Sequence, residues 1–85
     1  MSDAITTGLR ERLAGCFRAA FPDLDDAKVA TASMDTVPSW DSMYTLNIVA
    51  LVEEEFDIMI GIDEIGALAS FAAFEACVAR HVGAG

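Results

Sequence analysis

Apolar residues recur at helical spacing near the start of the chain, and this pattern predicts a helix from about Ile5 to Phe21. Pro22 follows and cannot continue the helical hydrogen-bond ladder, so the helix is expected to end at Phe21. One face of this helix is apolar and should pack on the core. It is formed by Ile5, Leu9, Leu13, Cys16, Phe17 and Ala20.

A second helix is predicted from about Ser42 to Phe56, with Asp41 as its N-cap, because a carboxylate there can accept backbone N–H bonds. This helix has apolar residues on two sides. The core stripe is formed by Thr45, Ile48, Val49, Val52 and Phe56. The second stripe begins beside Ser42 and is formed by Met43, Leu46, Asn47, Ala50 and Glu54.

A helix that is apolar on two sides is either central in its bundle or offers one side to a partner. A fully central helix is hard to build in so small a bundle, so we interpret the second stripe as a partner-docking face. The alternative is that Met43, Leu46 and Ala50 cover the connection formed by residues 22–41.

That connection is long, and long connections in compact domains are often functional. We expect irregular structure with one helical turn near Asp25–Ala30. Four apolar residues are expected to hold the connection against the core: Leu24, Val29, Met34 and Val37.

The second half of the chain predicts one short and one long helix. Ile58, Met59, Ile60 and Ile62 are apolar, but no partner strand is predicted elsewhere, so a tight connection is expected there. A short helix is expected to start at Asp63-Glu64-Ile65 and to end near Gly66 or Ala69. The last helix runs from about Phe71 to Val82 after Ser70, a plausible N-cap. Its apolar face is formed by Phe71, Phe74, Cys77, Val78 and Val82.

Composition agrees with a single domain over residues 1–85, because 54% of the residues are hydrophobic and the chain is short. No apolar run approaches the roughly 20 residues of a membrane span. The start lacks the features of a signal peptide and the end has no lipidation cysteine. We therefore expect a cytoplasmic protein without membrane insertion.

The net charge of −9 is unevenly distributed. Residues 1–21 carry a net charge of +1, and residues 22–85 carry −10. Such a surface repels nucleic acids and anionic membranes, so neither is expected as a partner. It would attract proteins with basic docking patches, although the charge is also explained by solubility alone.

Other chemistry has little support in the sequence. Cys16 and Cys77 are expected to be small buried hydrophobic residues, not a disulfide framework. His81 is the only histidine and lies near a helix end, where it favours the helix dipole. We therefore expect neither a His-rich metal site nor an internal Cys–His pair, and no nucleophile–base pair for catalysis. The chain is expected not to be an enzyme.

Two clusters of acidic residues are not expected to form a calcium site or a catalytic site. Counted from Asp23, an EF-hand loop would need glycine and glutamate where Lys28 and Met34 stand, so Asp23, Asp25 and Asp26 are interpreted as a solvated loop. Residues 53–55 are consecutive glutamates, which project in different directions on a helix and form no catalytic pair.

The stretch from Asp41 to Ile60 resembles the attachment-site helix of the acyl carrier proteins. Asp41-Ser42-Met43 is similar to the Asp-Ser-Leu of that family, and the Glu-Glu-Glu-Phe run at 53–56 follows its pattern. The resemblance extends over essentially the whole chain through Leu46, Val49, Leu51, Ile58, Ile60, Asp63-Glu64-Ile65 and Ser70-Phe71. The fold that it implies is a small all-α, acyl-carrier-like bundle of three main helices plus one short helix, with a long first loop.

The resemblance implies that Ser42, flanked by the N-cap Asp41, carries a covalent 4'-phosphopantetheine arm whose thiol holds acyl or aminoacyl groups as thioesters. The positive end of a helix suits such a phosphodiester, because free N–H groups and the helix dipole each stabilise it by up to about 1 kcal/mol. The partners implied are a phosphopantetheinyl transferase, an acyl- or aminoacyl-loading ligase, and downstream transferase or condensing enzymes. They would dock a monomer on Met43, Leu46, Asn47, Ala50 and Glu54.

Several residues depart from the family pattern. Ser39 and Trp40 stand where carriers usually have glycine and an aliphatic residue, and Tyr44, Asn47 and Val52 stand where acidic residues are common. A less acidic docking face favours a specialised biosynthetic pathway over general fatty acid synthesis. We expect Trp40 to contact the arm or a partner, because tryptophan is enriched at interfaces. The alternative is that Trp40 covers the core against the 22–41 loop. A carrier-like interaction module that is never modified is the alternative function.

Overall fold

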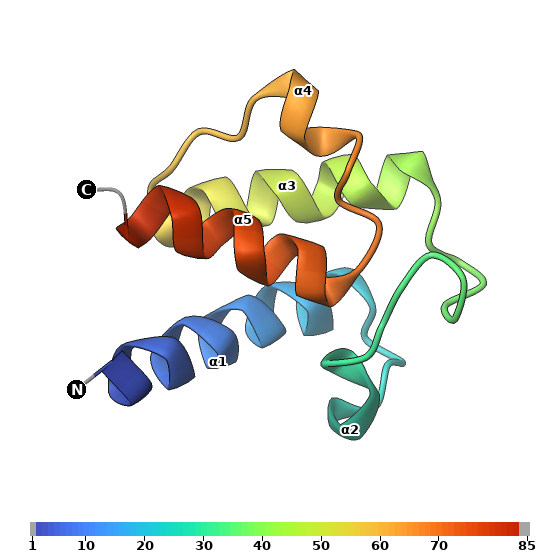
Figure 1. Cartoon of the computed structure of the whole chain (residues 1–85). Helices are drawn as coiled ribbons and strands as arrows, with labels where there is room; N and C mark the ends of the chain where they lie inside the picture. The colour runs from blue at the N-terminus through green and yellow to red at the C-terminus, as the bar shows by residue number, and fades with distance from the viewer. Residues whose placement is uncertain (1, 84–85) are drawn as a thin grey trace.

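Three long helices enclose the core in the computed structural model of this protein, which describes residues 2–83, and only the backbone of residues 2–7 and 26 (Figure 1). They are α1 (Ser2–Ala20), α3 (Ser42–Phe56) and α5 (Phe71–Gly83). Two single-turn helices lie between them, α2 (Asp26–Val29) and α4 (Ile62–Ile65). The predicted small all-α bundle is confirmed, and its radius of gyration is 12.0 Å, as a compact chain of this length should have.

The predicted helices agree closely with the observed ones. The second predicted helix has the same limits as α3, and α2 is the single turn expected in the 22–41 connection. The first helix starts earlier than predicted, at Ser2, and ends one residue earlier, at Ala20. The apolar face predicted for this helix is buried from Leu9 onward, whereas the side chain of Ile5 lies outside the described residues.

Phe17 on α1 is the centre of the core. Its ring lies 5.1 Å from that of Phe71 and 5.4 Å from those of Phe74 and Trp40, measured between centroids, in each case edge to face. Edge-to-face pairs stabilise beyond the area they bury. One aromatic side chain therefore joins α1, α5 and the loop that leads into α3.

Two ion pairs orient α1 against its neighbours. The Arg10 guanidinium lies 2.6 Å from a Glu75 carboxylate oxygen on α5, and the Arg12 guanidinium lies 2.8 Å from Glu55 on α3. Arg12 also lies over the ring of Phe56, 4.5 Å from its centroid. These contacts are exposed, so they help to orient α1 but contribute little to the free energy of folding.

The long connection before α3 is held in two ways. Val29 is buried, and Leu24 and Val37 pack against the core, as predicted. Met34 is instead exposed. The reason is an unexpected antiparallel bridge between Ser33 and Ser70, in which the Met34 backbone N–H donates to the Ala69 carbonyl at 2.9 Å. That bond fixes the backbone and leaves the methionine side chain outside.

The short helix α4 lies beside α3, with Ile65 packed against the core. Its N-cap is Gly61, whose backbone N–H donates to the Glu64 carboxylate at 3.0 Å. None of its four residues is buried. The expected connection after α3 is confirmed in place of a strand, but α4 begins at Ile62, one residue before its predicted start at Asp63, and ends at Ile65. Within residues 2–83, no helix is long and apolar enough to cross a membrane.

Candidate functional site

Ser42 is the first residue of α3, and its side chain is exposed. The preceding Asp41 is extended, with φ −123° and ψ −171°, and its carboxylate accepts the backbone N–H of Tyr44 at 3.1 Å. Asp41 is thus the N-cap that the sequence predicts. Because a capped helix start has a fixed direction, the Ser42 hydroxyl is presented to solvent from a defined turn.

Trp40 anchors this turn from inside the molecule. Its indole Nε1–H donates to the Thr45 hydroxyl oxygen at 2.8 Å, and that hydroxyl in turn donates to the Asp41 carbonyl oxygen at 3.3 Å. Trp40 is only 3% exposed. The assignment of Trp40 to the arm or to a docking partner was therefore wrong, because its ring is buried among the core aromatics. The structure supports the alternative, a core role beside the 22–41 loop.

The two stripes of α3 separate as predicted. The core stripe is buried from Thr45 to Val52, and Phe56 is half-buried at its end. Met43 is 73% and Leu46 51% exposed, which excludes the alternative that they cover the 22–41 connection. All members of the second stripe are exposed; they are Met43, Leu46, Asn47, Ala50 and Glu54. An exposed row that includes two large apolar side chains is a feature of interaction surfaces.

A shallow apolar hollow of about 320 Å³ opens beside Ser42. Its wall is formed by Leu46 of α3, by Ile65 and Leu68 of the α4 region, and by the exposed Met34. Sequence reasoning did not find this hollow, because it depends on where α4 lies relative to α3. A chain attached at Ser42 would start at the edge of a surface that can hold apolar groups.

The three consecutive glutamates near the end of α3 project in different directions, as predicted. The Glu53 carboxylate accepts the Ile60 backbone N–H at 2.8 Å and so fixes the chain after α3. Glu55 is the ion-pair partner of Arg12 on α1. Glu54 is exposed on the second stripe of α3. Glu53 and Glu55 therefore have structural roles, and Glu54 faces solvent.

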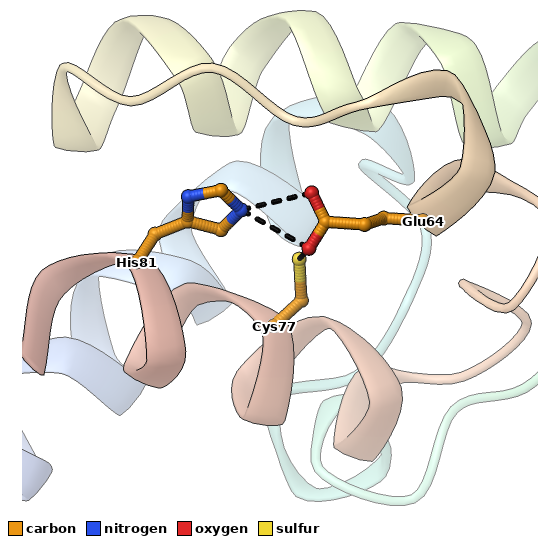
Figure 2. A group of neighbouring side chains, drawn as sticks. All are labelled: Glu64, Cys77 and His81. Atoms are coloured by element: carbon orange, nitrogen blue, oxygen red, sulfur yellow. Dashed lines mark hydrogen bonds and ion pairs between the residues drawn. The ribbon is translucent and has the colours of Figure 1, made fainter. Parts of the chain in front are cut away.

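A second group of side chains contradicts the sequence analysis (Figure 2). Glu64 of α4 meets Cys77 and His81 of α5, and their donor atoms all lie within 4.8 Å of one another. The expectation that no Cys–His pair would form was therefore wrong. Cys77 and His81 are four residues apart and share one face of a helix, a signal that was present in the sequence. The approach of Glu64 depends on tertiary packing and was not predictable.

The ionisation of this group follows from its contacts. Burial raises the pKa of the Cys77 thiol, so the thiol is protonated at neutral pH. The Glu64 carboxyl has a lowered pKa, mainly because it accepts the Gly61 backbone N–H and also because it bonds to His81. Both cysteines are free and buried, as predicted.

Comparison with known proteins adds no assignment: no protein-family model, curated protein or solved structure matches the chain. Function is therefore inferred from the residues and geometry of the site.

Proposed function

We propose that the protein is a carrier that holds acyl or aminoacyl intermediates as thioesters on a 4'-phosphopantetheine arm attached to Ser42. The observation that carries this proposal is the exposed Ser42 hydroxyl on the first turn of α3, directly after the N-cap Asp41 and at the edge of an apolar hollow. The resemblance of residues 41–60 to the attachment helix of acyl carrier proteins supplies the identity of the arm.

The position of Ser42 suits a phosphodiester. The first N–H groups of a helix have no partners within the helix, and the helix dipole is positive at this end. A phosphate attached to the Ser42 oxygen would be attracted by both. The buried Trp40–Thr45 hydrogen bond keeps the turn in place, so the arm would leave the protein in a constant direction.

The chemistry of loading is assigned to other proteins. His81, the only histidine, hydrogen-bonds to Glu64 at 3.0 Å and is therefore engaged away from Ser42. Attachment of the arm requires a phosphopantetheinyl transferase that uses coenzyme A. A ligase would then load the thiol, and downstream transferase or condensing enzymes would use the product in a specialised pathway.

The second stripe of α3 is the proposed docking surface for these enzymes. It offers apolar contacts from Met43 and Leu46 and a carboxylate from Glu54, all on the helix that Ser42 begins. A carrier must release each partner, which suits a small contact with electrostatic steering in place of a large apolar interface.

Intact mass spectrometry tests the proposal. The full chain is incubated with coenzyme A and a phosphopantetheinyl transferase of broad specificity, beside Ser42→Ala and the control Ser39→Ala, which removes another exposed serine three residues away. We expect a gain of one phosphopantetheine in the wild type and in the Ser39 variant, and none in Ser42→Ala. A folded wild type that gains no mass with any of several such transferases contradicts the carrier proposal.

The alternative is an interaction module that is never modified. The exposure of Met43 and Leu46 favours it, since these side chains are available whether or not Ser42 carries an arm. In cells that depend on the protein, Ser42→Ala should abolish the function of a carrier but have little effect on an interaction module. Leu46→Asp should impair both, which makes it the matched control.

A further inference from the structure

The group formed by Glu64, Cys77 and His81 presents three different donor atoms to one point between α4 and α5 (Figure 2). His81 Nε2 lies 3.1 Å and 3.0 Å from the two Glu64 carboxylate oxygens. Cys77 Sγ lies 3.6 Å from Glu64 Oε1. The carboxylate comes from one helix, and the thiol and imidazole come from successive turns of the other.

These spacings are close to those around a tetrahedral zinc ion. Zinc bonds of about 2.0–2.2 Å to nitrogen and oxygen and about 2.3 Å to sulfur place neighbouring ligands about 3.4–3.6 Å apart. The separation of sulfur and oxygen, 3.6 Å, already has that value, and the nitrogen–oxygen separations need to widen by only a few tenths of an ångström. The thiol and imidazole lie within 4.8 Å and can approach by side-chain rotation.

We propose that Glu64, Cys77 and His81 form a zinc site, with Cys77 Sγ, His81 Nε2 and a Glu64 oxygen as ligands and a water molecule in the fourth position. Mixed nitrogen, sulfur and oxygen ligands favour zinc over calcium or magnesium, which prefer oxygen alone. This site is on α4 and α5 and does not depend on modification of Ser42.

The surroundings allow an ion to enter. Cys77 is fully buried, but the side chains of Glu64 and His81 are 30% and 27% exposed, so the group is open to solvent on one side. The net charge of −9 attracts cations. The positive charge of Arg80 opposes binding, because its guanidinium lies 3.6 Å from Glu64 Oε1 and also interacts with the Cys77 thiol. The Arg80 side chain is 70% exposed and can turn into water when the carboxylate binds a metal.

Binding exchanges a proton for the metal without any change of oxidation state. The Cys77 S–H bond breaks, its proton goes to buffer, and the thiolate forms the zinc–sulfur bond. His81 binds as neutral imidazole through Nε2 and keeps its proton on Nδ1. One Glu64 oxygen binds the ion, and the other can continue to accept the Gly61 N–H.

A metal here would restrain a short helix that buries none of its own residues. None of the residues of α4 is buried, whereas Cys77 belongs to the core. Bonds from one ion to Glu64 and to α5 would restrain α4 and with it the wall of the hollow beside Ser42, to which Ile65 and Leu68 belong. Zinc is therefore expected to slow hydrogen exchange in residues 61–68.

The test uses the tag-free full chain and Co²⁺ as a spectroscopic probe for Zn²⁺. We expect a thiolate-to-cobalt charge-transfer band in the near ultraviolet and visible bands of tetrahedral intensity, both saturating at one cobalt per chain. Added Zn²⁺ should remove both bands by displacing the cobalt. Zinc affinity is then obtained from this competition.

Five variants separate this site from general binding of cations. His81→Gln, Cys77→Ala and Glu64→Gln each remove one ligand and should weaken binding by about 100-fold or more, since even indirect partners of metal ligands contribute 10–100-fold. Cys16→Ala removes the other buried thiol, and Asp63→Asn removes a neighbouring exposed carboxylate. Both controls should keep the wild-type spectrum and affinity.

His81 is half-buried in the last turn of α5, so His81→Gln should fold even if Cys77→Ala does not. Far-ultraviolet circular dichroism checks this. The proposal is overturned if the wild type shows no thiolate band, if His81→Gln binds with wild-type affinity, or if Asp63→Asn weakens binding as much as Glu64→Gln. Each of these results leaves the phosphopantetheine assay on Ser42 unaffected, so the two proposals fail separately.

Discussion

Trp40 fixes the geometry of an exposed serine from inside the core. Trp40→Phe should keep the ring packing but lose the Nε1–H bond to Thr45, which would lower the free energy of unfolding by about 0.5–1.5 kcal/mol. Trp40→Ala should cost about 3–5 kcal/mol because it leaves a large cavity. Urea titration measures both. An unchanged unfolding midpoint for Trp40→Ala would contradict the core role.

Cys16 is a second residue whose chemistry is set by its surroundings. Burial, and to a lesser degree the nearby Glu55 carboxylate, raises its pKa, so less thiolate is present at neutral pH than for a free cysteine. We expect slow labelling by a thiol reagent at pH 7 in the folded protein and fast labelling in denaturant. The measurement is made on the wild type by peptide mass after digestion, which separates Cys16 from Cys77. Rapid labelling of Cys16 in the folded protein would show that this thiol is accessible.

At the scale of the element, the N-cap hydrogen bond of α3 contributes to the free energy of unfolding. Asp41→Ala removes the acceptor for the Tyr44 N–H and should lower the free energy of unfolding by about 1 kcal/mol, within a range of 0.5–2. Asp41→Asn keeps an acceptor and should lower the free energy of unfolding much less. Chemical unfolding of the two variants shows which of them is less stable. Equal losses would indicate that the charge of Asp41 matters, not its hydrogen bond.

The other end of α3 depends on Asp57, which has a left-handed backbone with φ 54° and ψ 51°. Asp57→Val should destabilise the protein by about 1–2 kcal/mol, because a β-branched residue is strained in this conformation. Asp57→Gly should be tolerated, since glycine adopts it without strain. A thermal melt of both variants tests this. If the valine variant melts with the wild type, the chain leaves α3 differently.

Local signals explain why α3 was predictable. Its cap, its apolar periodicity and its end at Asp57 all lie within the helix or next to it, so the sequence pattern determines them. The side of α3 that faces the core follows from the same pattern. In contrast, the burial of Trp40 and the approach of Glu64 to Cys77 and His81 depend on contacts between distant segments. The hydrophobic pattern of a short stretch of sequence carries no information about such contacts.

At the scale of the whole molecule, charge should govern how partners approach. The strongly acidic surface steers basic patches over a distance of about 10 Å at 0.1 M salt but only about 3 Å at 1 M. We therefore expect the association rate with a phosphopantetheinyl transferase to fall as salt rises, and stopped-flow measurement checks this. A rate independent of salt would mean that Met43 and Leu46 dominate docking. Leu46→Ala is the control that separates the two contributions.

The candidate site as a whole was only partly predictable for the same reason. The exposure of Ser42 and of the second stripe follows from the pattern of α3. The hollow beside Ser42 needs the position of α4, which depends on the Gly61–Glu64 and Ile60–Glu53 hydrogen bonds and on the burial of Ile60 and Leu68 at its two ends. A helix of a single turn such as α4 has too few residues for a helical repeat of apolar positions to be recognised in the sequence.

The backbone bridge between Ser33 and Ser70 brings together the two ends of a 36-residue excursion that contains α3 and α4. The chain enters and leaves this excursion through two bonds of 2.9 Å, Met34 N–H to Ala69 and Phe71 N–H to Ala32. Because its ends are adjacent, the excursion has the topology of an insertion between α1 and α5. It carries part of the core as well as Ser42 and the proposed docking stripe, because Trp40 packs on Phe17 and Ile48 and Val52 are buried. A replacement of the excursion would therefore change the site and the aromatic core together.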